Sequence, residues 1–288
     1  MIDYDYKKPD SLKDVFGLLK EYGPKATLIA GGTDVMLDIR NKKLSPDVLI
    51  SLRGLKDLSY IKKNSGYHIG AMTTHRMLER SDVVMTDLSA LHDGSKKIGS
   101  VQIRNVATIG GNICNAAPSA DTAGPLLALD TTVVLEGLGG ERKVPIAEFF
   151  TGPSKTVRKT EEVLVEFEIP GKMEGFGSAY WKHSRRKAMD LPILGVAVAI
   201  KFSEKDIISD ARIALTVAAP TPIRAYSAED FLKGKNVNDE VLKEAGKIAS
   251  SEASPRDSLR GKKWYREEMI EVFVPRMARL AAERTQNR

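Results

Sequence analysis

The sequence predicts a protein of mixed helices and strands that folds as two or three packed subdomains. The chain has 288 residues, which is long for one ordinary hydrophobic core. Roughly its first 55 residues have the pattern of a β-α-β unit, whereas turn residues typical of hairpins appear from Tyr60 onward. Three glycines between Gly171 and Gly177 indicate a boundary, beyond which strands come first and helices follow.

Capping residues and apolar spacing predict the individual elements. Ser11 can cap the first helix, and Gly23-Pro24 ends it. Asp239 is placed to cap a later helix, and Pro275 is expected to bend the last one. The predicted strands are 27–30, 48–52, 60–63, 67–71, 131–136, 142–144, 162–169, 179–183, 193–202 and 211–218. The predicted helices are 11–22, 74–80, 87–97, 239–251 and 264–284, and the segment 99–115 is rich in glycine and asparagine.

Composition excludes several classes of protein. With 42% hydrophobic and 28% charged residues the chain resembles soluble globular proteins, and no apolar run approaches the roughly 18–20 residues of a membrane helix. The single cysteine, Cys114, excludes an intrachain disulfide framework and any iron–sulfur cluster ligated within this chain. The four histidines lack metal-ligand spacing, so we expect no metal site. The absence of a secretory pattern favours the cytoplasm.

The charge balance leaves two interpretations open. The chain carries 44 Lys and Arg against 38 Asp and Glu, a net charge of +6. Such an excess can indicate nucleic acid, an acidic partner or an anionic cofactor. The cations are interleaved with acids except at 182–187, which reads Lys-His-Ser-Arg-Arg-Lys. A solvated face explains that run more simply than nucleic-acid binding does.

Two glycine pairs are the remaining candidates for a binding site. Residues 137–142 lack the final glycine and the helix of a dinucleotide fingerprint, and residues 152–156 lack the glycine before the lysine of a phosphate loop. Gly31-Gly32 follows a predicted strand, and Gly110-Gly111 lies 79 residues later. Adjacent glycines usually form only a tight turn. They can also direct successive backbone N–H groups toward a phosphate, so two such nests could hold the two phosphates of a dinucleotide.

The residues around these glycines resemble a known family. The matching segments are Ala30-Gly31-Gly32-Thr33-Asp34, residues 102–112 (QIRNVATIGGN), Ala117-Pro118-Ser119-Ala120-Asp121, residues 149–153 and residues 182–190. They resemble the FAD-binding medium subunit of molybdenum hydroxylases, the family of xanthine dehydrogenase and aerobic carbon monoxide dehydrogenase. The resemblance covers essentially the whole chain. It implies an α+β fold, with a two-subdomain FAD-binding fold of the vanillyl-alcohol oxidase type (1–56 and 57–172) followed by a C-terminal domain of sheet and helices (173–288).

The resemblance also implies which residues bind the cofactor. The two glycine loops are expected to wrap the FAD pyrophosphate and ribityl chain, Asp121 to contact the cofactor, and Leu164 to supply an apolar contact. Ile98 stands where some members place an aromatic residue. An inward-pointing Lys182 would stabilise the anionic reduced flavin and raise its redox potential. The two loops comprise Leu28, Ile29, Ala30, Gly31, Gly32, Thr33, Asp34 and Val35, and Thr108, Ile109, Gly110, Gly111 and Asn112.

The implied function is electron transfer without a catalytic residue or metal ligand in this chain. Electrons from a molybdopterin-binding large subunit would pass through [2Fe–2S] clusters in a small subunit to this FAD, and then to NAD, oxygen or a quinone. A dimer of heterotrimers is expected, and Cys114 is expected to be a small packing residue. The alternatives are a stand-alone FAD-dependent oxidoreductase acting on a small organic substrate, a scaffold that has lost its cofactor, and a nucleic-acid-binding protein.

Overall fold

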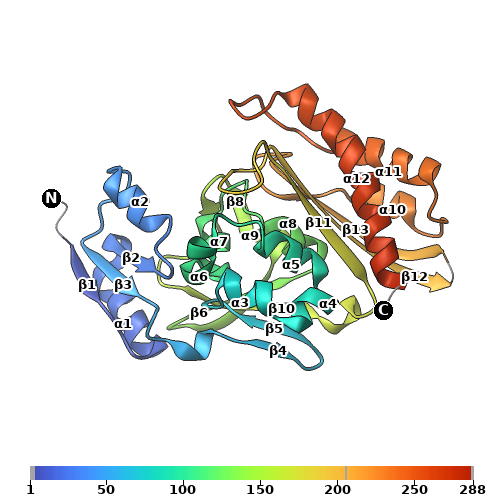
Figure 1. Ribbon diagram of the computed structural model, residues 1–288. Coiled ribbons are helices and arrows are strands. Elements are labelled where there is room, and N and C mark those ends of the chain that lie inside the picture. The colour runs from blue at the N-terminus through green and yellow to red at the C-terminus, as the bar shows by residue number, and fades with distance from the viewer. Residues whose placement is uncertain (1–3, 205, 287–288) are drawn as a thin grey trace.

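The N-terminal part of the computed structural model is a small parallel sheet with two helices; the structure describes residues 4–204 and 206–286 (Figure 1). Strands β1 (Asp5–Lys7), β3 (Val48–Ser51) and β2 (Ala26–Ile29) lie side by side in that order. Helix α1 (Leu12–Tyr22) begins where predicted, because the Ser11 side chain accepts a hydrogen bond from the Asp14 N–H. Helix α2 (Val35–Arg40) connects β2 to its parallel neighbour β3, which confirms the β-α-β unit. The three-residue strand β1 was not predicted.

A five-stranded antiparallel sheet forms the middle of the molecule. Its order is β4 (Ile61–Lys63), β5 (Gly66–Gly70), β10 (Val163–Pro170), β6 (Thr132–Gly137) and β7 (Gly140–Pro145). The helices of this part are α3 (His75–Arg80), α4 (Asp82–Asp87), α5 (Ser89–Ser95), α6 (Val101–Val106), α7 (Ile109–Asn115), α8 (Ala123–Ala128) and α9 (Ile146–Phe149). A short hairpin, β8 (Phe150–Gly152) and β9 (Lys155–Thr156), follows α9.

Three predictions for this middle part were wrong or incomplete. The helix predicted at 87–97 is α5, which is shorter at both ends, and α4 directly before it was not predicted; Leu88 leaves helical geometry between the two. The glycine- and asparagine-rich segment contains α6 and α7, whose first turns are capped by the side chains of Ser100 and Thr108. Helix α8 was missed, and all six of its residues are buried, so its apolar run has no amphipathic period.

The C-terminal part is a four-stranded antiparallel sheet covered on both faces. Its strands are β11 (Gly177–His183), β12 (Leu194–Glu204), β13 (Ile207–Thr216) and β14 (Ile223–Arg224). Helices α10 (Tyr226–Leu232), α11 (Asp239–Ser251) and α12 (Lys263–Gln286) cover one face, while α5 and α8 of the middle part pack on the other (Figure 1). Asn238, not Asp239, caps α11, because its side chain accepts from the Val241 N–H. Helix α12 runs through Pro275 without interruption.

Buried contacts fix the C-terminal sheet to the middle part. One core cluster contains Leu91 and Ile113 together with Tyr180, Ala197 and Ala214 of the C-terminal sheet. Near the end of α12, Arg284 donates to Asp93 of α5 (Nη1 to Oδ2, 2.7 Å) and to the Ser178 carbonyl (2.7 Å). Side chains carried by α5, α8 and β11 therefore have fixed relative positions. None of the helices in the described ranges is long and apolar enough to cross a membrane.

Candidate FAD-binding site

The two glycine pairs meet in space although 79 residues separate them. A Cβ atom at Gly31 would lie 2.2 Å from the Val106 carbonyl oxygen, so only glycine allows this approach of the first loop to the end of α6. A Cβ atom at Gly111 would lie 3.8 Å from the Cβ of Ala30. The first glycine loop of the N-terminal part thus packs directly on the second glycine loop of the middle part.

The first glycine loop has the features of an anion-binding turn. Gly32 has a φ of +76°, a conformation that L side chains rarely adopt. Among residues 4–204 and 206–286, the backbone N–H groups of Gly31 to Asp34 donate to no other residue. The carbonyls of Ala30 and Gly31 are instead held by Arg53, whose Nε and Nη2 donate to them at 3.2 and 3.0 Å. The free N–H groups can therefore donate to a bound acceptor such as phosphate.

The second glycine loop does not form a second nest, which corrects the hypothesis of two equal nests. The N–H groups of Ile109 and Gly110 donate to the carbonyls of Thr73 (3.0 Å) and Ala71 (2.9 Å), and that of Gly111 donates to Thr108 Oγ1 (3.1 Å). A Cβ atom at Gly110 would lie 2.7 Å from the Ala71 carbonyl oxygen. Gly110 is thus required for packing beyond the end of β5.

A cavity of about 450 Å³ opens where the two loops meet. It is lined by Ala30, Arg53, Leu55, Lys56, Ser59, Met72, Thr74, Asn105, Val106 and Thr108. Two of these side chains are cationic and none is acidic, so the cavity suits an anionic group. Arg53 and Lys56 were not predicted from the sequence. Their position in the fold could have indicated them. The segment that carries Arg53 follows the carboxyl end of β3, and the first glycine loop follows the carboxyl end of its parallel neighbour β2.

A buried ion pair forms a second group of predicted site residues. Lys182 Nζ lies 2.6 Å from Asp121 Oδ2, and the Tyr180 hydroxyl donates to Asp121 Oδ1 at 2.9 Å. The Lys182 side chain is 6% exposed and also donates to the Lys97 carbonyl (3.2 Å), so it points inward as the resemblance requires. Burial raises the pKa of Asp121 to about 6, although Lys182 acts in the opposite direction. Because Lys182 is paired, its charge is largely neutralised toward other groups.

Several of the other predicted residues pack into hydrophobic clusters instead of joining either group. Ile109 is fully buried in the core of the middle part, and Leu28, Ile29 and Val35 pack within the N-terminal part. Ile98 directly follows Lys97 and belongs with the ion pair. Asn112 Oδ1 accepts from Thr122 Oγ1 at 2.6 Å, next to Asp121, so α7 connects the glycine loops to the ion pair. Leu164 pairs with Leu135 inside the sheet and is 3% exposed. The structure therefore places Leu164 in the core of the middle part.

Two other features contain side chains that could carry chemistry, a histidine–glutamate cluster and Cys114. The ligand atoms of His68, Glu166 and Glu168 lie within 4.8 Å of one another, a grouping the sequence analysis did not anticipate. Tyr60 already donates to Glu166, and Lys143 lies 2.7 Å from Glu168, so these charges have partners. Burial raises the pKa of the Cys114 thiol to about 11, which disfavours the reactive thiolate. Cys114 packs against the core of the middle part, as expected.

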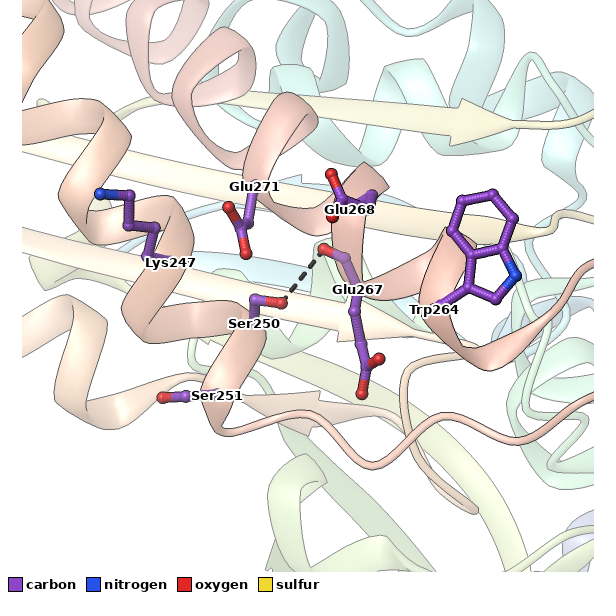
Figure 2. A pocket seen from close by; sticks show the side chains of 7 residues that line it. All are labelled: Lys247, Ser250, Ser251, Trp264, Glu267, Glu268 and Glu271. Atoms are coloured by element: carbon purple, nitrogen blue, oxygen red, sulfur yellow. Dashed lines mark hydrogen bonds between the residues drawn. The ribbon is translucent and has the colours of Figure 1, made fainter.

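An open groove of about 380 Å³ lies between α11 and α12, away from the predicted site (Figure 2). Its lining residues are Lys247, Ser250, Ser251, Trp264, Glu267, Glu268 and Glu271. The Ser250 hydroxyl donates to the Glu267 carbonyl at 3.1 Å across the two helices (Figure 2). The groove contains no predicted site residue, and its three carboxylates do not suit an anionic cofactor.

Comparison with known proteins decides the family. Residues 2–172 match the family described as FAD binding domain in molybdopterin dehydrogenase, and residues 179–281 match the CO dehydrogenase flavoprotein C-terminal domain. The chain belongs to the family of FAD-binding medium subunits of molybdenum hydroxylases. It is an oxidoreductase subunit whose cofactor is FAD, and the medium subunits of this family work with large and small partner subunits that carry the molybdenum and iron–sulfur centres.

Individual relatives cover nearly the whole chain. The xanthine dehydrogenase FAD-binding subunit of Escherichia coli O157:H7 is 34% identical over 281 residues, 96% of each chain. The glyceraldehyde dehydrogenase medium chain of Sulfolobus acidocaldarius is 32% identical over 94% of this chain and 96% of its own length. A solved structure of carbon monoxide dehydrogenase from Hydrogenophaga pseudoflava superposes with a TM-score of 0.93 at 34% identity and 98% coverage of both chains. These matches support a subunit of a complex over a stand-alone oxidoreductase and establish the α+β fold.

Proposed function

We propose that this chain binds FAD between its three parts and passes electrons from the [2Fe–2S] clusters of a small subunit to an external acceptor. The observation that carries the proposal is the first glycine loop: the N–H groups of Gly31 to Asp34 donate to no other described residue, and Ala30 lines a cavity with two cationic and no acidic side chains. The FAD supplies the redox chemistry when bound, and the protein supplies its position and its electrostatic surroundings.

In this proposal each group of residues has a separate task. The N–H groups of Gly31 to Asp34 donate to the pyrophosphate, with Arg53 fixing the loop and adding positive charge. Thr108 and Asn112 offer side-chain contacts, since the N–H groups beside them are engaged within the protein. The group formed by Ile98, Asp121 and Lys182 faces the flavin end of the cofactor. Leu164 acts by supporting the core.

The boundaries 1–56, 57–172 and 173–288 remain our proposal for the domain division. It is supported by three sheets that each draw their strands from one of these segments. We further propose a dimer of heterotrimers in the cytoplasm, with NAD, oxygen or a quinone as acceptor. The single cysteine suits a reducing compartment and leaves the clusters to a partner.

Purification from the native host tests the proposal. We expect a flavin absorption spectrum, one FAD per chain, and co-purification with an iron–sulfur chain and a molybdopterin-binding chain. FAD should bind the purified Arg53→Met variant about tenfold or more weakly than the wild-type chain. The variant loses the positive charge of Arg53 and the hydrogen bonds that Arg53 donates to the first glycine loop. A colourless chain that purifies alone and does not take up FAD would contradict the proposal.

A further inference from the structure

A histidine and two glutamates gather on the outer face of the middle sheet. His68 of β5 stands directly opposite Glu168 of β10, and Glu166 lies two residues before Glu168. Phe167 between the glutamates is fully buried in the core of the middle part, so both carboxylates point to the opposite face of the sheet. Because that core also contains Ile109, the second glycine loop lies on the side of the sheet away from this cluster.

The three side chains present their coordinating atoms to one another. His68 Nδ1 lies 3.1 Å from Glu166 Oε1, and the ligand atoms of all three residues lie within 4.8 Å of one another. Ligand atoms at about 2.0–2.1 Å from a tetrahedral Zn²⁺ are roughly 3.4 Å apart, so His68 and Glu166 already have a coordinating separation. A small rotation of the Glu168 side chain completes a set of three ligands and leaves the fourth position to water.

Tyr60 orients the Glu166 carboxylate from outside the cluster. Its hydroxyl donates to Glu166 Oε2, while Oε1 faces His68. Burial and this hydrogen bond raise the pKa of Tyr60, so the phenol stays a neutral donor. Gly70 stands opposite Glu166, and a Cβ atom there would lie 3.0 Å from the Tyr60 ring, so glycine admits the ring at this place. Carboxylates that bind metals are commonly held by such an outer hydrogen bond.

The neighbouring lysines leave the cluster open to a metal ion. Lys143 Nζ lies 2.7 Å from Glu168 Oε1, but the Lys143 side chain is 52% exposed, and exposed ion pairs are weak. Lys62 stands opposite His68 and holds its ammonium over the Tyr60 ring, 4.5 Å from the centroid. A divalent ion can displace Lys143 from the cluster, because it neutralises two half-buried carboxylates at once.

We propose that His68, Glu166 and Glu168 form a structural Zn²⁺ site. One imidazole with carboxylates suits Zn²⁺, whereas Ca²⁺ and Mg²⁺ prefer oxygen ligands alone. Strand pairing brings His68 and Glu166 together across 98 residues of sequence, so their spacing along the chain does not indicate the site. The bound ion links β5 to β10, and through Tyr60 it steadies the segment that enters from the N-terminal part. Ser59 of that segment lines the cavity beside the first glycine loop.

Calorimetric titration of the full-length chain with Zn²⁺, without a histidine tag and after treatment with EDTA, tests this proposal. His68→Gln and Glu168→Gln each remove one ligand. The matched control Glu136→Gln makes the same change on the neighbouring strand β6, and Lys143→Met removes the competing cation. None of these four side chains belongs to a buried residue, so the variants should fold, which circular dichroism checks.

We expect wild type and Glu136→Gln to bind one Zn²⁺ per chain with equal affinity, and Zn²⁺ to raise their melting temperatures. The two ligand variants should bind at least about 100-fold more weakly, since loss of an outer hydrogen bond alone costs about 10–100-fold. Lys143→Met should bind about threefold more tightly than wild type.

Three results would overturn the inference. The first is a wild-type chain that binds no stoichiometric Zn²⁺, and the second is equal affinity of wild type and His68→Gln. The third is a Lys143→Met variant that binds no more tightly than wild type, because Glu168 would then not be a ligand. The titration is repeated with and without FAD, and since the cluster lies away from the second glycine loop, the expected affinities do not depend on the proposed function.

Discussion

The ion pair of Lys182 and Asp121 permits a quantitative test through the variant Lys182→Met. In the wild-type protein the pKa of Asp121 is raised from 3.8 to about 6, so keeping the carboxylate ionised in the folded state costs about 3 kcal/mol above pH 6. Lys182 is the partner that limits this cost, at 2.6 Å and with almost no exposure to water. Its removal leaves a buried carboxylate whose remaining donor within residues 4–204 and 206–286 is the Tyr180 hydroxyl.

The expected loss of stability depends on pH, and its sign follows from the direction of the pKa shift. A folded-state pKa above the unfolded one means that the folded protein binds the proton more tightly, so stability falls as pH rises through that window. At pH 8 the variant should lose about 3–5 kcal/mol, the usual cost of breaking a buried pair. At pH 5 Asp121 is mostly protonated in both proteins, and the loss should shrink to about 1 kcal/mol for the hydrogen bond to Lys97.

Urea denaturation of the purified chain at pH 5 and pH 8 measures the difference. Lys96→Met is the matched control, because Asp93 keeps Arg284 at 2.7 Å after its contact with Lys96 is removed. That variant should lose at most about 1 kcal/mol, with little dependence on pH. Equal destabilisation by Lys182→Met at both pH values would show that Asp121 is not the titrating group and would refute the prediction.

Three further predictions address the loops and the core. Gly31→Ala should lower FAD affinity more than tenfold in equilibrium titrations, since its Cβ would displace the Val106 carbonyl, whereas Gly17→Ala in open space on α1 should raise stability by about 0.5–1 kcal/mol. The pKa of His75 is lowered to about 3, mainly by burial and secondarily by Arg104. The free energy of unfolding of the wild-type protein should therefore be undiminished above pH 6.5 and fall by up to about 5 kcal/mol toward pH 3, and His75→Leu should remove this dependence. A pH titration of the melting temperature checks this, and an unchanged acid limb would contradict it. At pH 8 His75→Leu should be near neutral in stability, because neither ring nitrogen has a hydrogen-bond partner among the described residues.

The sequence predicted most strands because they are short apolar or β-branched runs bounded by turn residues, as in β3 with its four buried residues, whereas β1, β8, β9 and β14 were missed. It failed at α6 and α7, where glycine and asparagine give low helix propensity. These helices are stabilised by capping hydroxyls and by hydrogen bonds from Ile109 and Gly110 to the distant carbonyls of Thr73 and Ala71. Such long-range bonds cannot be inferred from local pattern, so the residues of the second loop were predicted while their backbone geometry was not.

The same limit explains the roles that were misjudged within the site. The pattern of the first loop predicted N–H groups that point toward a ligand, and these groups donate to no other residue in the part of the chain that the structure describes. The pattern could not show that the N–H groups of the second loop donate hydrogen bonds to other groups within the protein. Arg53 was not predicted because a single arginine after a strand is not part of any sequence motif. Only the parallel pairing of β2 and β3 brings it to the carbonyls of Ala30 and Gly31.

Arg104 explains why so specific a motif surrounds the second glycine loop. Its guanidinium is nearly buried and donates to Glu79 (Nε to Oε2, 2.9 Å) and to the Ile98 carbonyl (2.9 Å). Arg104 thus fixes the position of Ile98, beside the ion pair, relative to α6. The end of α6 packs against Gly31 and is followed by Thr108. The motif acts by holding the two groups of the site at a set separation. In the binding mode that we propose, FAD spans both groups and each group contacts only one end of it, so a fixed separation favours simultaneous contact with both.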